Sequence, residues 1–213
     1  MSEPVARSPI APAPPVTVVA GWEVSGRRAS AGRTETGVTI TDCTPLAKVQ
    51  LRAPVAGRAG AAVGVPFGRA ARDAAGALVV GSGPGEWLLL GPPGHATALA
   101  AGLDKIAAQA GDEPVTWVDL THGRALIRLT GSRAAGAVGK LCGIDLSDDV
   151  TPDGAAFRSS VASLATDVIR DDLATRSYLL HCERSSGQYL FDMLLRSGAE
   201  FGIEIDGLQH PGI

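Results

Sequence analysis

The sequence predicts an α+β fold with mixed or antiparallel sheets and about three helices. Two kinds of pattern support this class. Several short segments alternate apolar and polar residues, which is typical of half-buried strands. Other segments carry apolar residues three or four positions apart, which is typical of one face of a helix. These patterns form two strand–helix–strand units, and no sequence repeat is visible beyond that arrangement.

The length and composition are those of an ordinary globular protein. A chain of 213 residues suits one large domain or two small ones. At this size roughly 70% of the unfolded surface can be buried, so a substantial core is possible. The net charge of -3 gives no general electrostatic reason to expect nucleic acid or an acidic membrane as a partner.

The cellular setting is predicted from what the sequence lacks. No run of about 18 apolar residues is present, so no membrane span is expected. The N-terminus lacks the continuous apolar core of a signal peptide. Three widely spaced cysteines without a C-x-x-C pattern indicate a reduced, cytoplasmic location rather than a disulfide framework. These cysteines are Cys43, Cys142 and Cys182.

The N-terminal region is predicted to lie outside the main domain. Residues 1–20 are rich in proline, which favours an extended arm or a disordered tail; an arm that lies on a partner is the alternative. Residues 21–37 have no apolar period and are predicted to be a loop. The expected division is therefore an arm and loop at 1–37, a domain at 38–205 and a tail at 206–213.

Two strands are predicted next, at residues 38–41 and 47–52. The second strand carries its polar side chains on one face, and they are Lys48, Gln50 and Arg52. This face holds only two charges, so we interpret it as a solvated strand face rather than a nucleic-acid site.

The glycine-rich segment 81–85 (GSGPG) is predicted to be a turn between two strands. A dinucleotide-binding loop needs G-x-G-x-x-G at the start of a helix, where amide groups meet the phosphates. Here the third glycine position is Glu86, and the strand pattern 86–90 follows. A helix with its apolar face at Leu99, Leu103, Ile106 and Ala110 comes next, ends at Gly111 and leads to a strand at 115–119.

The clearest unit of the chain lies between residues 118 and 146. Residues 124–130 alternate as a strand, Gly131 permits a sharp turn, Ser132 is expected to cap a helix, and Gly143 is expected to end it. The apolar residues of that helix are Ala134, Ala135, Val138, Leu141 and Cys142.

Beyond this unit, strands are expected at 155–164 and 177–183, with a final strand at 201–205. Between the last two, a helix is capped by Ser185 or Ser186 and ends at Gly198.

No catalytic, cofactor-binding or metal-binding residue is predicted on this chain. The histidines do not have the spacing that places two imidazoles on one metal ion. No G-x-S-x-G nucleophile motif or Walker motif is present. His122, at the start of a strand, is interpreted as structural. The four histidines are His95, His122, His181 and His210.

The region 118–146 resembles the gamma subunit of heterotetrameric sarcosine oxidase. It is similar, more distantly, to the N-terminal half of the glycine-cleavage T-protein, a folate-binding aminomethyltransferase. The resemblance covers about residues 38–205, and the string GEWLLL at 85–90 resembles a segment of the same gamma family. The matching residues of the first region are Val118 to His122, Leu129 to Gly131, Ala134, Leu141, Asp145 and Leu146.

The resemblance implies an aminomethyltransferase folate-binding-like fold and a non-catalytic subunit of an oxidoreductase acting on CH–NH groups. The family's complexes demethylate sarcosine oxidatively and feed one-carbon metabolism. Alpha, beta and delta subunits would be the partners. FAD, FMN, NAD and zinc would belong to those subunits, and tetrahydrofolate to the alpha subunit. The gamma chain would frame the path of the reactive intermediate.

One pair of carboxylates, Asp171 and Asp172, resembles a T-protein segment in which an aspartate serves folate chemistry. A carboxylate in a lined cavity can hold a pterin or assist an amine nitrogen. The match is partial, and the departures from the T-protein pattern stand at Thr166, Asp167, Cys182 and Glu183. A polar turn between strands is therefore the prediction for the two aspartates, with a folate site as the alternative.

Two other functions remain open on the sequence: a stand-alone folate-binding aminomethyltransferase-like protein, and a stand-alone binding module of the same fold. The N-methyl amine that a complex would oxidise is not encoded in any motif of this chain.

Overall fold

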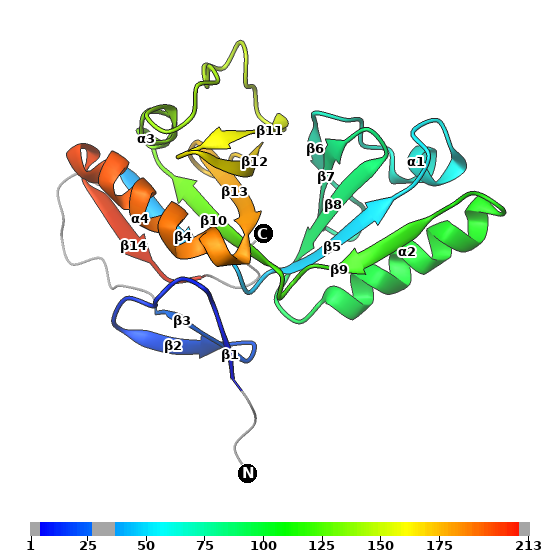
Figure 1. Cartoon of the computed structure of the whole chain (residues 1–213), viewed down its shortest axis with the longest axis horizontal. Coiled ribbons are helices and arrows are strands. Elements are labelled where there is room, and N and C mark those ends of the chain that lie inside the picture. The colour runs from blue at the N-terminus through cyan, green and yellow to red at the C-terminus, as the bar shows by residue number, and fades with distance from the viewer. Residues whose placement is uncertain (1–4, 27–36, 209–213) are drawn as a thin grey trace.

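The computed structural model describes residues 5–26 and 37–208, which form three β-sheets and four α-helices (Figure 1). The six-stranded sheet with α3 and α4 lies in one half of the molecule, and the five-stranded sheet with α1 and α2 lies in the other. A small three-stranded sheet is built from the N-terminal region. The α+β class with mixed and antiparallel sheets is thus confirmed.

The six-stranded sheet is antiparallel except at one edge, where β14 runs parallel to β4. Helices α3 (Ala134–Gly139) and α4 (Gly187–Gly198) pack on one face and enclose the largest apolar core of the described chain. In spatial order the strands are β11 (Ala156–Val161), β12 (Leu164–Arg170), β13 (Ser177–Glu183), β10 (Arg124–Thr130), β4 (Val38–Asp42) and β14 (Ile203–Asp206).

The five-stranded sheet is antiparallel throughout. Strand β8, helix α2 (Ala96–Ala110) and strand β9 follow one another in the chain, so the predicted strand–helix–strand unit is confirmed. The two strands are not neighbours in the sheet, because β5 lies between them and runs antiparallel to both. Helix α1 (Arg58–Val63) packs beside α2. In spatial order the strands are β6 (Ala70–Arg72), β7 (Leu78–Gly83), β8 (Glu86–Gly91), β5 (Ala47–Arg52) and β9 (Thr116–Asp119).

The N-terminal region is more ordered than its composition predicts. It forms β1 (Ala6–Arg7), β2 (Val16–Val19) and β3 (Trp22–Ser25). The expectation of a loop from residue 21 onward is wrong at β3, whose Trp22 and Val24 side chains are buried. Residues 27–36 lie outside the described part of the chain, as do 1–4 and 209–213, which include His210.

The arm itself packs on this chain rather than standing free. Ile10 is 2% exposed and belongs to the core of the six-stranded sheet. The Ala11 amide donates to Gln188 Oε1 of α4 at 2.7 Å. The prediction of a free, disordered tail is therefore wrong for this part of the arm, because a single large aliphatic side chain anchors it.

Two further segments contain elements that the sequence did not predict. The small-residue stretch 53–85 contains α1, β6 and β7, whose alanine and glycine content hides any apolar period. The strand expected at 155–164 is a hairpin, since the chain reverses at Ala162 and Ser163, both with positive φ, and continues as β12.

Several helix ends also differ. Ser132 does not cap α3, whose N-cap residue is Arg133, and Gly143 does not adopt positive φ. Ser186 is the N-cap residue of α4 but makes no side-chain capping bond. After Gly198 the chain continues into a 3₁₀ turn, Ala199–Phe201, and reverses at Gly202, whose φ is 70°.

Gly131 forms the predicted sharp turn. Its φ of 133° is a conformation that other residues rarely adopt, and an added Cβ would lie 2.4 Å from the Gly37 carbonyl oxygen. Gly111 likewise ends α2 with positive φ, as predicted.

A second apolar core fills the space between the two large sheets. Strand β5 is therefore covered on both faces, one by α2 and the other by the six-stranded sheet. Lys48 lies on the inner face and is 0% exposed, so the interpretation of its strand face as solvated is wrong for this residue. Arg52, at the end of the same face, is exposed as expected.

Candidate functional site

The two aspartates singled out in the sequence lie in the turn between β12 and β13, as predicted, and both are held by arginines. Asp171 accepts hydrogen bonds from Arg128 at 2.8 Å and from Arg72 at 3.1 Å. Asp171 is 8% exposed, and Arg128 is 5% exposed. The carboxylate is thus the counter-ion of a buried guanidinium and has little freedom to contact a ligand.

Asp172 is likewise held by hydrogen bonds from the strands on either side of the turn, β12 and β13. It accepts bonds from Arg170 at 2.7 Å and from the Ser177 amide at 2.9 Å. Burial opposes its charged form, but these bonds outweigh burial and hold the pKa of Asp172 below its ordinary value. The pair therefore acts as a polar turn that fixes the start of β13.

A second polar chain crosses strands β11, β12 and β13. The Arg158 Nε atom donates to Asp167 Oδ1 at 2.7 Å, and His181 Nδ1 lies 2.9 Å from Asp167 Oδ2. Burial lowers the pKa of His181, and the hydrogen bond with Asp167 only partly offsets this. Its Nε2 atom is buried without a hydrogen-bond partner among the described residues. Sequence reasoning did not single out this arrangement, since the three residues are separated by up to 23 positions in the sequence.

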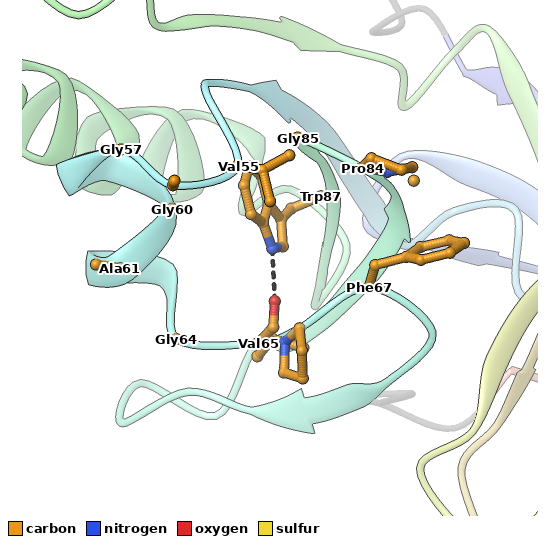
Figure 2. Close-up of a pocket in the computed structure, with 13 residues that line it drawn as sticks. Val55, Gly57, Gly60, Ala61, Gly64, Val65, Phe67, Pro84, Gly85 and Trp87 are labelled. Carbon is orange, nitrogen blue, oxygen red and sulfur yellow. Dashed lines mark hydrogen bonds between the residues drawn. The ribbon is translucent and has the colours of Figure 1, made fainter.

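A pocket lies beside α1, on the face of the five-stranded sheet that points away from the six-stranded sheet (Figure 2). It has a volume of about 380 Å³ and is bounded by α1, residues 65–67 and the turn 83–85. The Trp87 indole forms its floor and donates to the Val65 carbonyl oxygen at 2.7 Å. The lining residues are Val55, Ala56, Gly57, Gly60, Ala61, Gly64, Val65, Pro66, Phe67, Gly83, Pro84, Gly85 and Trp87.

The chemistry of this pocket is that of an apolar contact surface. None of its lining residues is charged or titratable. Two large side chains at its margin, Val55 and Phe67, are 63% and 59% exposed. The turn predicted at 81–85 is shorter in the structure: residues 81–83 end β7, and Pro84 and Gly85 connect β7 to β8. Gly83, Pro84 and Gly85 form part of the pocket wall. Such a surface can bind apolar side chains but offers no acid, base or nucleophile.

The other two described histidines, His95 and His122, lie in different parts of the structure. His122 stacks on Trp22 with ring centroids 4.7 Å apart, which agrees with a structural role. His95 is exposed at the start of α2. No group of three or more potential metal ligands occurs within residues 5–26 and 37–208.

The three cysteines are unpaired and buried. Cys142 and Cys182 lie in the core of the six-stranded sheet, as their positions on apolar stripes predict. Burial raises the pKa of the Cys43 and Cys182 thiols to about 11, so both are protonated at neutral pH and poorly nucleophilic. In the part of the chain that the structure describes, no helix is long and apolar enough to cross a membrane.

Comparison with known proteins gave matches among solved structures only. No protein-family model and no curated protein matches the chain. A chain of heterotetrameric sarcosine oxidase from Corynebacterium sp. U-96, solved with pyrrole 2-carboxylate, aligns with a TM-score of 0.67 and 26% identity. The alignment covers 80% of this chain and 88% of that one.

The second match is aminomethyltransferase T of the glycine cleavage system from Bartonella henselae, with a TM-score of 0.65 and 15% identity. It covers 92% of this chain but 56% of that one, so this chain spans about half of the transferase. The likeness to the transferase concerns the fold alone. The chain is a distant structural relative of the sarcosine oxidase chain and has the aminomethyltransferase-type fold.

Proposed function

We propose that this chain is a gamma-type, non-catalytic subunit of a multi-subunit oxidase that demethylates sarcosine or a related N-methyl amino acid. The observation that carries the proposal is the alignment with a chain of heterotetrameric sarcosine oxidase along nearly all of that chain's length. A match of that extent supports an equivalent whole subunit rather than a shared fragment.

The partners in this proposal are the alpha, beta and delta subunits. FAD, FMN, NAD, zinc and tetrahydrofolate are held by those subunits, and this chain binds none of them. Two features of the chain support that division. The aspartates at the T-protein-like position are engaged by Arg72, Arg128 and Arg170. The pocket beside α1 is apolar and has no titratable group in its lining.

The proposed contribution of this chain is packing. An apolar pocket flanked by exposed Val55 and Phe67 suits contact with a neighbouring subunit better than contact with a small polar amine. The runner-up is a stand-alone folate-binding aminomethyltransferase-like protein, which requires a folate site formed by this chain alone.

The proposal is tested by expressing the chain by itself and recording its visible spectrum after gel filtration, with and without sarcosine and tetrahydrofolate. We expect no flavin absorbance, no peroxide and no retained folate, because the proposed cofactor sites belong to other subunits. Flavin that survives gel filtration, or peroxide formed from sarcosine, contradicts the non-catalytic role. Stoichiometric folate binding by the lone chain favours the runner-up.

A further inference from the structure

The two large sheets meet at a joint where the chain crosses between them twice. Residues 43–46 lead from β4 to β5, and residues 120–123 lead from β9 to β10. Each crossing is bonded to a strand beside it: the Cys43 amide donates to the Leu126 carbonyl oxygen of β10 at 2.8 Å, and the Lys48 amide of β5 donates to Thr121 Oγ1 at 3.0 Å. If one sheet rotated against the other, the backbone of these two crossings would have to change conformation.

A second contact closes the far end of the joint. The Ala70 amide donates to the Gly154 carbonyl oxygen at 2.7 Å, and the Ala156 amide donates to the Gly68 carbonyl oxygen at 3.0 Å. The ion pair between Arg72 of β6 and Asp171 also spans the two sheets. Between the two ends the joint relies on the apolar inter-sheet core.

His181 faces this inter-sheet space from β13. It pairs with Leu126 of β10 in the sheet register, and Leu126 belongs to the inter-sheet core. With Nδ1–H donated to Asp167, the neutral ring leaves Nε2 as an acceptor. Nε2 has no partner within residues 5–26 and 37–208. A proton on Nε2 would create a buried N–H donor that has no acceptor. It would also place a positive charge on His181 in the same inter-sheet space as the Lys48 amine, and both effects cost free energy.

The charges that act on His181 come from strands of both sheets. Asp167 on β12 favours the protonated ring, while Lys48 on β5 and Arg124 on β10 oppose it. Arg158 on β11 already shares the Asp167 carboxylate. The Asp167 carboxylate therefore already has Arg158 as its cation, and Lys48 and Arg124 disfavour a further charge on His181.

Lys48 is the fully buried cation of the opposite sheet. Its Nζ atom donates to the carbonyl oxygens of Thr44 and Leu46, within the first crossing, at 2.6 and 2.7 Å. Burial lowers its pKa to about 7. The other charged or titratable groups that act on it are Asp42, Cys43, Asp119 and Arg184.

We propose that the joint is an acid-sensitive contact: uptake of a proton by His181, facing charged Lys48 across the inter-sheet core, loosens the packing of the six-stranded sheet against the five-stranded sheet. An open joint lets His181 titrate as in water, at a pKa of about 6.5. The closed joint keeps it neutral, so the open state binds more protons below that pH and gains population as the pH falls.

The size of the effect follows from this difference. If His181 stays neutral in the closed joint, the ratio of open to closed molecules rises roughly eightfold between pH 7 and pH 5.5. Lys48 contributes only about a twofold change in this window, because its folded pKa is close to the upper limit. Burial raises the pKa of Asp42, so its titration favours the closed state in acid and reduces the effect.

The test is hydrogen exchange of the full chain at pH 7 and pH 5.5, corrected for the intrinsic exchange rate at each pH. We expect amides in segments 43–46, 68–70 and 154–156 to exchange roughly eightfold faster at pH 5.5. Amides of α2 report on the five-stranded sheet alone and should not change. His181→Gln should reduce the acceleration to at most the roughly twofold change expected from Lys48. His95→Gln, which replaces an exposed histidine, should retain the full acceleration.

A titration of the wild-type protein by NMR gives an independent outcome if the His181→Gln variant does not fold. The His181 ring should remain neutral until below pH 6.5, and its protonation should coincide with the faster exchange. A His181 midpoint at or above 6.5 overturns the proposal. So does equal acceleration in His181→Gln, or unchanged protection of the three segments at pH 5.5.

Discussion

At the scale of single residues, charge burial distinguishes structural roles from catalytic ones. Asp171 is the acceptor for both Arg72 and Arg128, and the Arg128 guanidinium also donates to Ser177 Oγ at 2.8 Å. Removal of the carboxylate leaves a buried cation without its counter-ion, which is costly. The ion pairs therefore give Asp171 a role in stability.

Asp171→Asn should lower the free energy of unfolding by about 2–3 kcal/mol, since bonds to charged groups are lost and Arg128 stays buried. Urea denaturation measures this, with exposed Asp149→Asn as the matched control, which should change it by less than about 0.5 kcal/mol.

The same Asp171→Asn variant should leave turnover nearly unchanged in an assembled oxidase that retains its full subunit content. A loss near a hundredfold, the lower range for removal of a general acid or base, would assign Asp171 to a working folate or amine site.

Lys48 shows a limit of residue-level reasoning from sequence. Strict alternation in β5 predicts the strand correctly but does not say which face meets water. Since both faces of β5 are covered, the polar face contains a fully buried amine, Lys48, beside exposed Arg52. Only the sheet-on-sheet packing, which depends on residues far apart in sequence, reveals this.

At the scale of elements, the strands and helices with a regular apolar pattern were predicted from the sequence, and those without such a pattern were missed. Strand β13 and helix α2 follow long, regular apolar patterns, and the structure confirms both. Helix α1 consists mainly of alanine and glycine, so it carries no apolar period to detect. Strand β3 is four residues long, which is too short for a periodic signal.

In the candidate site, local sequence predicted the turn at Asp171 and Asp172 but not the contacts that these residues make with distant strands. The arginines that engage these aspartates come from β6, β10 and β12. The polar chain from Arg158 to His181 likewise depends on the register of three strands, which local patterns do not determine.

The N-terminal segment yields an element-scale prediction. Ile10 is buried in the main core although its flanking sequence is rich in proline. Ile10→Ala should therefore destabilise the chain by about 2–4 kcal/mol, the cost of a large-to-small change in a core. It should also speed proteolysis within residues 5–20. Val16→Ala, at a site 50% exposed, is the control and should have little effect. Equal stability of the two variants would show that the arm does not anchor the fold.

At the scale of the whole molecule, the described chain combines a well-packed interior with an apolar surface that its own elements leave open. The pocket beside α1, with Val55 and Phe67 at its margin, is a surface of the kind that a permanent subunit contact covers. The polar residues that resemble a folate site form ion pairs and hydrogen bonds that join neighbouring strands. Both features agree with a packing role in a larger assembly.

The central claim is tested most directly by the composition of the assembly purified through a tag on this chain, together with its visible spectrum and its sarcosine-dependent peroxide production. We expect one discrete complex that contains a flavin-binding subunit in fixed stoichiometry and oxidises sarcosine or another N-methyl amino acid. The double variant Val55→Ser with Phe67→Ser should weaken assembly, while Tyr189→Ser, 49% exposed on α4, should not. A stable monomer that purifies without a flavin subunit from cells that demethylate such amines would contradict the account.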